Sequence, residues 1–148
     1  MGVRTVAVIG AGTMGAGIAQ VCAQSGWETR LYDAFPEGLA KGMMVIDAFW
    51  DKGIERGKTS SEQKSEWSGN LHTASDMAGA VSGVDLVIEA APENMDLKQG
   101  IFAELERLAP SHAVLATNTS SLPISEIASA TGCAERIIGM HFFNPVPL

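Results

Sequence analysis

Basic residues are scarce in this sequence. Ten lysines and arginines stand against 17 aspartates and glutamates, which gives a formal net charge of −7 over 148 residues. Nucleic-acid binding depends on a basic stripe or patch that neutralises phosphates, and the sequence contains none. We therefore expect no nucleic-acid partner and interpret the acidity as a feature that favours solubility.

Cysteine is equally rare, with one residue at Cys22 and one at Cys133. No C-x-x-C pair and no metal-ligand spacing is present, so we expect no metal site. Cys22 falls on the apolar face of an expected helix and is interpreted as a core residue, whereas Cys133 lies in a glycine-containing turn and could be exposed. We expect reduced thiols and a cytoplasmic protein, with the mitochondrial matrix as the alternative.

Long apolar runs are absent as well. Residues 1–5 lead directly into a strand pattern and lack the apolar stretch and cleavage site of a secretory signal. No run approaches the length that spans a bilayer, so we expect no membrane association. With 46% hydrophobic residues and no visible repeat or linker, residues 1–148 are expected to form one domain.

Short apolar runs alternate with segments of helical periodicity along the chain. Continuous apolar strands separated by helices are typical of a parallel sheet covered on both faces. The pattern predicts an α/β fold of the Rossmann type, with a doubly wound, mainly parallel sheet and helices on both faces. The expected strands cover residues 3–9, 28–32, 84–89, 113–117 and 136–142, and the expected helices cover residues 13–25, 97–108 and 123–130 and a longer segment from Pro36.

Two of the expected helices carry apolar stripes at helical spacing. The segment between these two helices, residues 59–70, is polar, and its pattern allows a short helix with Trp67 turned inward. The stripes consist of Leu39, Met43, Ile46 and Trp50 in one helix, and of Leu97, Ile101, Leu105 and Leu108 in the other.

A glycine-rich loop, G-A-G-T-M-G at residues 10–15, follows the first strand and opens a helix. In that context it predicts a dinucleotide site. Gly10 permits the tight turn, Gly12 lets the backbone approach a pyrophosphate at the helix N-terminus, and Gly15 allows close helix–sheet packing. We expect cofactor contacts from Gly10, Gly12, Thr13, Met14 and Gly15.

Asp33 ends the second expected strand, where an acidic residue accepts hydrogen bonds from the adenosine ribose. Its charge would repel a 2′-phosphate, and residues 34–36 contain no arginine. NAD is therefore favoured over NADP, while FAD shares the same loop pattern and stays open.

Two further motifs, N-T-S-S-L at residues 118–122 and H-F-F-N-P-V at residues 141–146, fall at the ends of expected strands. Parallel strands present their carboxyl ends at one edge of the sheet, so a hydroxyl, an imidazole and a carboxamide should meet beside the nicotinamide. Alternatively, Ser120 or Ser121 starts the following helix through its hydroxyl.

With the glycine loop and E-A-A-P-E-N at residues 89–94, these motifs resemble the 3-hydroxyacyl-CoA dehydrogenase family over essentially the whole chain. The resemblance implies NAD-dependent oxidation of (3S)-3-hydroxyacyl-CoA to 3-ketoacyl-CoA, and the reverse, in fatty-acid β-oxidation. The two phenylalanines after His141 favour an acyl-CoA substrate. The alternatives are a non-catalytic NAD-binding module and a related dehydrogenase of a non-CoA hydroxy acid.

The resemblance also implies roles for individual residues. His141 looks like the catalytic base, because an imidazole can accept and return a proton near neutral pH. Ser120 would hydrogen-bond the reacting oxygen beside the nicotinamide. Asn144, Glu93 and Lys98 resemble cofactor contacts on the nicotinamide side, with ordinary surface charges as the alternative for the last two.

The same resemblance places an orienting glutamate and a helical domain, with the acyl pocket and the surface of a homodimer, beyond Leu148. We therefore expect the isolated chain to be almost inactive. Lys52, Arg56 and Lys58 are basic candidates for contacts with CoA, although a solvated face is the simpler interpretation.

Overall fold

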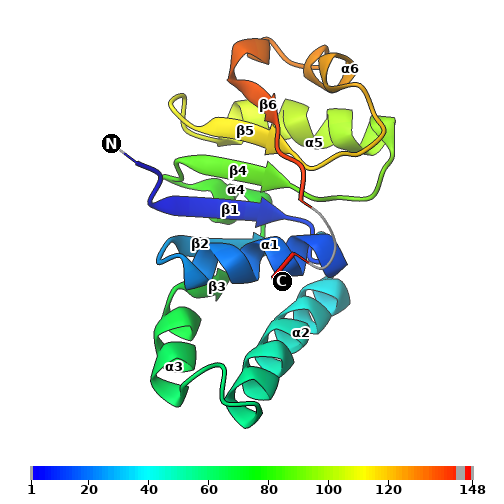
Figure 1. Cartoon of the computed structure of the whole chain (residues 1–148). Coiled ribbons are helices and arrows are strands. Elements are labelled where there is room, and N and C mark those ends of the chain that lie inside the picture. The colour runs from blue at the N-terminus through cyan, green and yellow to red at the C-terminus, as the bar shows by residue number, and fades with distance from the viewer. Residues whose placement is uncertain (1, 143–145, 148) are drawn as a thin grey trace.

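The computed structural model describes residues 2–142 and 146–147. Its strands form one six-stranded sheet in the order β3-β2-β1-β4-β5-β6, and every neighbouring pair is parallel (Figure 1). This doubly wound order confirms the Rossmann-type prediction. The strands are β1 (Thr5–Ile9), β2 (Glu28–Tyr32), β3 (Leu71–Thr73), β4 (Leu86–Glu89), β5 (Val114–Thr117) and β6 (Ile137–Gly139).

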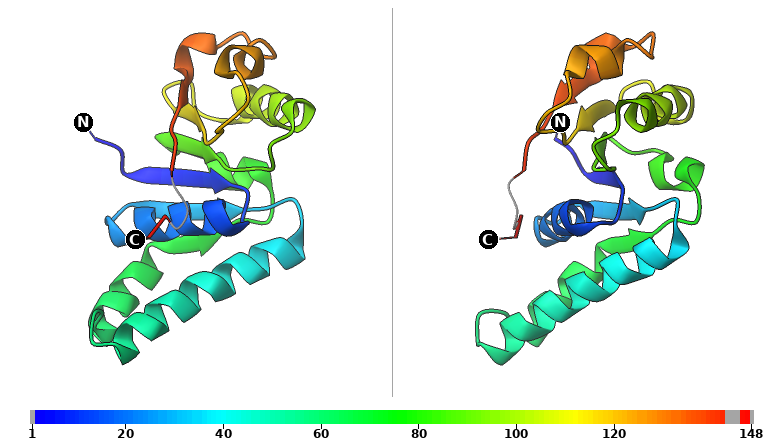
Figure 2. Two further views of the ribbon diagram at one scale, coloured as in Figure 1. Left: turned by 45° about the vertical axis from the view of Figure 1, so that its right-hand side comes forward. Right: turned by 90° about the vertical axis from the view of Figure 1, so that its right-hand side faces the viewer.

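Side chains of β1 alternate between two separate cores. Val6 and Val8 pack on the side of α1 (Thr13–Gln24), whereas Ala7 and Ile9 pack on the side of α4 (Met77–Val81) and α5 (Met95–Leu108). Figures 1 and 2 show these helices on opposite faces of the sheet. Burial on both faces explains why the strands appear in the sequence as unbroken apolar runs.

Helix α2 (Pro36–Glu55) and helix α3 (Ser61–Gly69) extend past the β3 edge of the sheet (Figure 2). The stripe expected for α2 is confirmed, since Ile46 and Trp50 are buried and Leu39 and Met43 pack against the same core. Trp67 of α3 turns inward as expected, with its ring centroid 5.8 Å from that of Trp50. The two helices are thereby joined to the α1 side of the sheet.

The sequence analysis missed β3 and α4. Leu71 is the only buried residue of β3, and α4 has five residues, so neither element is long enough to establish a periodicity. Their signals are local polar contacts instead: the Asp76 carboxylate caps α4 by accepting from the Gly79 amide. The Asn70 side chain, by contrast, makes a distant contact, donating to the Ala23 carbonyl of α1, and its backbone carbonyl accepts from the Thr29 amide of β2 where β3 begins.

In the last third of the chain, the bounds of a strand and a helix and the burial of one cysteine differ from expectation. The last strand is Ile137–Gly139, shorter than 136–142, because the chain then leaves the sheet edge and crosses towards α1. Helix α6 covers Ile124–Ala128, within the expected 123–130. Cys133 is buried in the core under α6, so exposure of its thiol was wrong, whereas Cys22 is a core residue as predicted. Over the described ranges, no helix is long and apolar enough to cross a membrane.

Candidate active site

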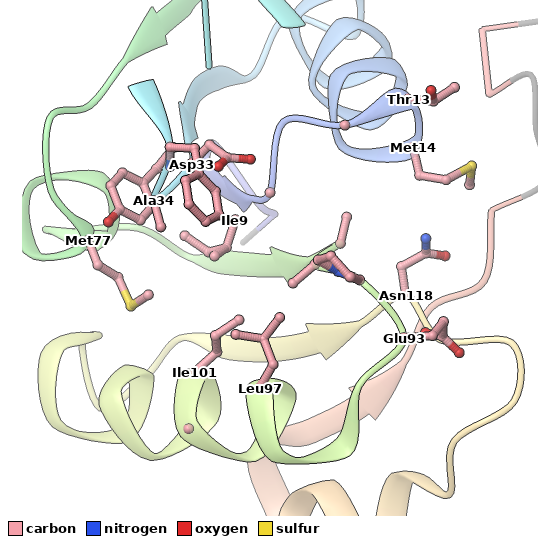
Figure 3. Close-up of a pocket in the computed structure, with 18 of the residues that line it drawn as sticks. Ile9, Thr13, Met14, Asp33, Ala34, Met77, Glu93, Leu97, Ile101 and Asn118 are labelled. Atoms are coloured by element: carbon pink, nitrogen blue, oxygen red, sulfur yellow. Dashed lines mark hydrogen bonds between the residues drawn. The ribbon is translucent and has the colours of Figure 1, made fainter. Parts of the chain in front are cut away.

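A cleft of about 1080 Å³ runs along the carboxyl edge of the sheet. Figure 3 shows Asp33 and Ala34 at one end and Glu93 and Asn118 at the other. Most of its lining comes from segments that follow the last residues of the strands, which is the edge where open α/β sheets bind ligands. These residues include Gly10, Gly12, Asp33, Ala34, residues 90–93, Asn118, Ser120, His141 and Phe142.

The glycine loop has the geometry that a dinucleotide requires. Gly10 has φ +106°, and a Cβ there would lie 2.8 Å from the Ala90 carbonyl oxygen. A Cβ on Gly15 would lie 1.7 Å from the Gly10 carbonyl oxygen, so the helix could not approach the strand. A Cβ on Gly12 would meet nothing within 4 Å and would fill open space at the start of α1. A pyrophosphate fits this space, beside backbone N–H groups that no side chain caps.

Asp33 links the glycine loop to the start of α2. One carboxylate oxygen accepts from the Ala11 amide at 2.8 Å, and the other accepts from the Phe35 amide at 2.9 Å. The residue is half-buried and lines the cleft. Since each carboxylate oxygen can accept a second hydrogen bond, Asp33 can hold a ribose hydroxyl while it fixes the loop.

The apolar side of the cleft comes from α5, through one edge of its apolar stripe. Phe102 and Leu105 are the buried apolar residues of this helix, whereas Leu97 is 43% exposed and lines the cleft with Ile101. Ile101, Leu105 and Leu108 of the predicted stripe pack against the core, so the stripe is confirmed apart from Leu97. Leu97 and Ile101 form the wall opposite Asp33 (Figure 3).

The buried face of α5 carries a charge. Lys98 and Glu89 are both fully buried, and the Lys98 ammonium donates to Glu89 at 2.5 Å and to the Ala91 carbonyl at 3.0 Å. Glu89 also accepts from the Thr117 hydroxyl at 2.6 Å and from the Ala91 amide at 2.7 Å. The pair thus joins the ends of β4 and β5 to Ala91, which forms part of the floor of the cleft. A direct contact between Lys98 and a cofactor stays a prediction, because this side chain is buried beneath that floor.

Glu93 connects this buried pair to the loop after β5. Its carboxylate lies 3.4 Å from the Lys98 ammonium and accepts from the hydroxyls of Thr119 and Ser121, each at 2.8 Å. Desolvation alone would raise the pKa of Glu93, but these hydrogen bonds and the Lys98 charge lower it to about 2. Glu93 is therefore a carboxylate throughout the physiological pH range.

The contacts of Glu93 decide how the serines are used. The Ser121 hydroxyl donates to Glu93, and Pro123 precedes α6 without a side-chain cap, so the helix-start interpretation of the serines was wrong. Ser120, between the two residues that Glu93 holds, is exposed and lines the cleft.

His141 reaches the same end of the cleft from the segment after β6. Its Nδ1 lies 3.5 Å from the Thr119 carbonyl oxygen. Asn118, which the sequence analysis named only as part of a motif, fixes this segment by accepting from the Phe142 amide at 3.1 Å. Asn144 lies outside the described residues. The structure thus brings Ser120, His141 and Glu93 to one end of the cleft.

Replacing Lys98 with methionine should destabilise the domain strongly, because it leaves Glu89 buried without its cation. We expect a loss of about 3–5 kcal/mol in the free energy of unfolding, measured by urea denaturation. Lys64→Met is the matched control, since Lys64 pairs with Asp51 at the surface and such pairs contribute little. Equal shifts of the two midpoints would contradict a structural role for the buried pair.

Comparison with known proteins identifies the family. The sequence profile described as "3-hydroxyacyl-CoA dehydrogenase, NAD binding domain" matches residues 5–148. This chain belongs to the 3-hydroxyacyl-CoA dehydrogenase family. The resemblance in the glycine loop, N-T-S-S-L and H-F-F-N-P-V motifs is thereby confirmed, and the cofactor of the matched domain is NAD rather than FAD.

Named relatives and solved structures agree with this assignment. A probable 3-hydroxybutyryl-CoA dehydrogenase of Bacillus subtilis is 44% identical, over 100% of this chain and 51% of its own length. The mitochondrial hydroxyacyl-coenzyme A dehydrogenase of Rattus norvegicus is 42% identical, over 99% of this chain and 48% of its own. A crystal structure of 3-hydroxybutyryl-CoA dehydrogenase from Escherichia coli superposes with a TM-score of 0.95 at 42% identity, over 100% of this chain and 31% of that one. The chain thus spans about half the length of the first two.

Proposed function

We propose that this chain supplies the cofactor domain and part of the active site of an enzyme that interconverts (3S)-3-hydroxyacyl-CoA and 3-ketoacyl-CoA with NAD. The observation that carries the proposal is the meeting of His141 and Ser120 with the glycine loop along one cleft. A protein that only senses or stores NAD needs the loop and Asp33 but no imidazole and hydroxyl at the other end. The relatives whose names specify acyl-CoA substrates support that substrate class.

The cofactor would lie along the cleft with its adenosine at Asp33, its pyrophosphate at Gly12 and its nicotinamide at Glu93. When bound, NAD accepts a hydride from the carbon that carries the substrate hydroxyl. Thr13 and Met14 begin α1 and line the cleft beside the pyrophosphate position. Gly10, Gly12 and Asp33 line the cleft too, which supports the expected cofactor contacts, whereas Gly15 is buried where the helix meets the strand and would act through packing alone.

The protein's own side chains would manage the proton. His141 accepts the proton of the substrate hydroxyl while hydride leaves the same carbon, so that the product carries a carbonyl group. Ser120 donates a hydrogen bond to the reacting oxygen, and Glu93 holds the loop that carries Ser120. In the reverse direction His141 returns the proton.

The experiment that tests the proposal is an assay of acetoacetyl-CoA-dependent NADH oxidation, by a form of the protein that includes the second domain implied by the resemblance. Free hydroxy acids and their keto acids serve as the comparison substrates. Turnover restricted to the free acids would place the protein among dehydrogenases of non-CoA substrates. A homodimer, and a cytoplasmic or matrix location, remain part of the proposal; the named relatives include bacterial and mitochondrial proteins.

NAD should bind this chain at least about 10-fold more tightly than NADP, because a 2′-phosphate would replace the hydrogen bonds to Asp33 by charge repulsion. Calorimetric titration of both cofactors checks this. Lys41→Ala is an informative control, since Lys41 and Asp33 border a smaller hollow of about 280 Å³ beside the glycine loop. Equal affinities that depend on Lys41 would show that α2 accommodates the phosphate and that Asp33 does not discriminate.

A further inference from the structure

Four carboxylates line the cleft. Its lining includes the carboxylates of Asp33, Glu93, Asp96 and Glu104, and among the described residues that line it there is no lysine or arginine. The ammonium of Lys98 lies close to this lining but is fully buried. Any group that binds in the cleft therefore meets negative side chains with little positive compensation at the surface.

The charges at the Glu93 end do not cancel. One ammonium, that of Lys98, serves two carboxylates, and it lies closer to Glu89 at 2.5 Å than to Glu93 at 3.4 Å. Glu89 is enclosed in the core with its partners, whereas the Glu93 side chain is 38% exposed on the cleft. The cluster thus presents an excess negative charge to the cleft through Glu93.

Hydrogen bonds hold this charge in place. The hydroxyls of Thr119 and Ser121 and the Ser121 amide all donate to one carboxylate oxygen of Glu93. Donors of this kind stabilise the ionised form and fix its position. The low pKa of Glu93, about 2, agrees with a permanent charge at this site.

We propose that the Glu93 carboxylate discriminates between the two oxidation states of the cofactor, and favours binding of NAD⁺ over NADH. The inference rests on the proposed function, which places the nicotinamide at this end of the cleft. The nicotinamide ring carries a positive charge in NAD⁺ and none in NADH, whereas the rest of the molecule is the same in both. A fixed negative charge beside the ring therefore stabilises one form and leaves the other nearly unaffected.

The discrimination has a consequence for the reaction. Tighter binding of NAD⁺ relative to NADH shifts the equilibrium between the bound cofactor forms towards NAD⁺. Bound NADH becomes a better hydride donor to a 3-keto group, and the hydride and a proton from His141 together give the 3-hydroxy group. Glu93 acts here through the charge of the cofactor rather than by contact with the substrate.

Calorimetric titration of NAD⁺ and NADH into this chain tests the proposal through the ratio of the two dissociation constants. Glu93→Gln retains a carbonyl acceptor for Thr119 and Ser121 but removes the charge. The ratio Kd(NADH)/Kd(NAD⁺) should fall by at least about 5-fold, the size expected for unit charges about 4 Å apart that are screened as fully as in water. Glu93→Ala, a second neutral variant, should lower the ratio by a similar factor whatever it does to the individual affinities.

Two controls separate charge from structure. Glu93→Asp retains the charge while it disturbs the contacts, so it should keep most of the wild-type ratio. Glu135→Gln removes the same charge from the exposed 3₁₀ helix Ala134–Arg136, outside the cleft, and should leave the ratio unchanged. If the neutral variants weaken both cofactors by the same factor, Glu93 only positions the loop and the proposal fails. If the wild-type chain binds neither cofactor, the proposed function itself fails.

Discussion

In a form of the protein that includes the second domain implied by the resemblance, replacing His141 with glutamine should lower the turnover of acetoacetyl-CoA by roughly 10²–10⁴-fold, the usual contribution of a positioned acid–base group. Glutamine can hydrogen-bond but cannot accept the substrate proton. Because the glycine loop and Asp33 are unchanged, the dissociation constant for NAD should stay within about 2-fold of the wild-type value. Steady-state kinetics on acetoacetyl-CoA and calorimetry on the same protein provide the two numbers.

His112→Gln is the matched control for this substitution. His112 is exposed and pairs with Asp85 just before β4, at the opposite edge of the sheet from the cleft. Its loss should leave turnover unchanged. If the His141 variant retained most of its activity, another group would have to receive the proton, and the assignment of His141 would be wrong.

The chain of 148 residues by itself should bind NAD yet turn over almost no substrate. The cleft holds the glycine loop, Asp33 and Glu93, so the cofactor contacts are largely present. The resemblance places the glutamate that orients His141, and the helical domain that forms the wall around the acyl group, beyond Leu148. Loss of the group that orients a catalytic histidine can cost about 10⁴-fold in rate.

Turnover per chain, compared with that of a longer form of the protein that carries the second domain, measures this loss. NAD titration of both forms is the control and should give dissociation constants within about 3-fold of each other, because the cofactor contacts are shared. Comparable turnover would contradict the division of the active site between two domains. It would also require that residues of this chain alone orient His141.

Local sequence patterns were sufficient for the first half of the site. The glycine loop joins consecutive elements, and Asp33 reaches it by hydrogen bonds to Ala11 and Phe35, residues close in the chain or across one neighbouring strand pair. The steric demand on Gly15 arises against the Gly10 carbonyl within the same strand–turn–helix unit, whereas the demand on Gly10 comes from Ala90 after β4. Such geometry follows from chain connectivity, so the loop pattern and the acidic residue predict it directly.

The second half of the site depends on tertiary contacts. The carboxylates belong to β4 and the turn after it, at Glu89 and Glu93. Their hydroxyl partners are Thr117, at the end of β5, and Thr119 and Ser121 in the loop after it, 26 or more residues later in the chain. The apolar period of α5 predicted a helix with Leu97 in its apolar stripe, and it left Lys98 as a surface or cofactor contact. A lysine contributes polarity to any periodic pattern, and its burial is decided only when a carboxylate from a neighbouring strand is packed against it.

The sequence by itself determined the order of the longer elements, though not β3 and α4, together with the cofactor loop and the chemical groups at the carboxyl edge, because these depend on apolar periodicity and on motifs within a few residues. The tertiary structure alone decided which of those groups meet. The parallel register of β4 with β5 brings Glu89 beside Thr117, and the turn after β4 brings Glu93 to the loop that carries Ser120. Register and helix rotation are set by packing across the whole sheet, which no local pattern encodes.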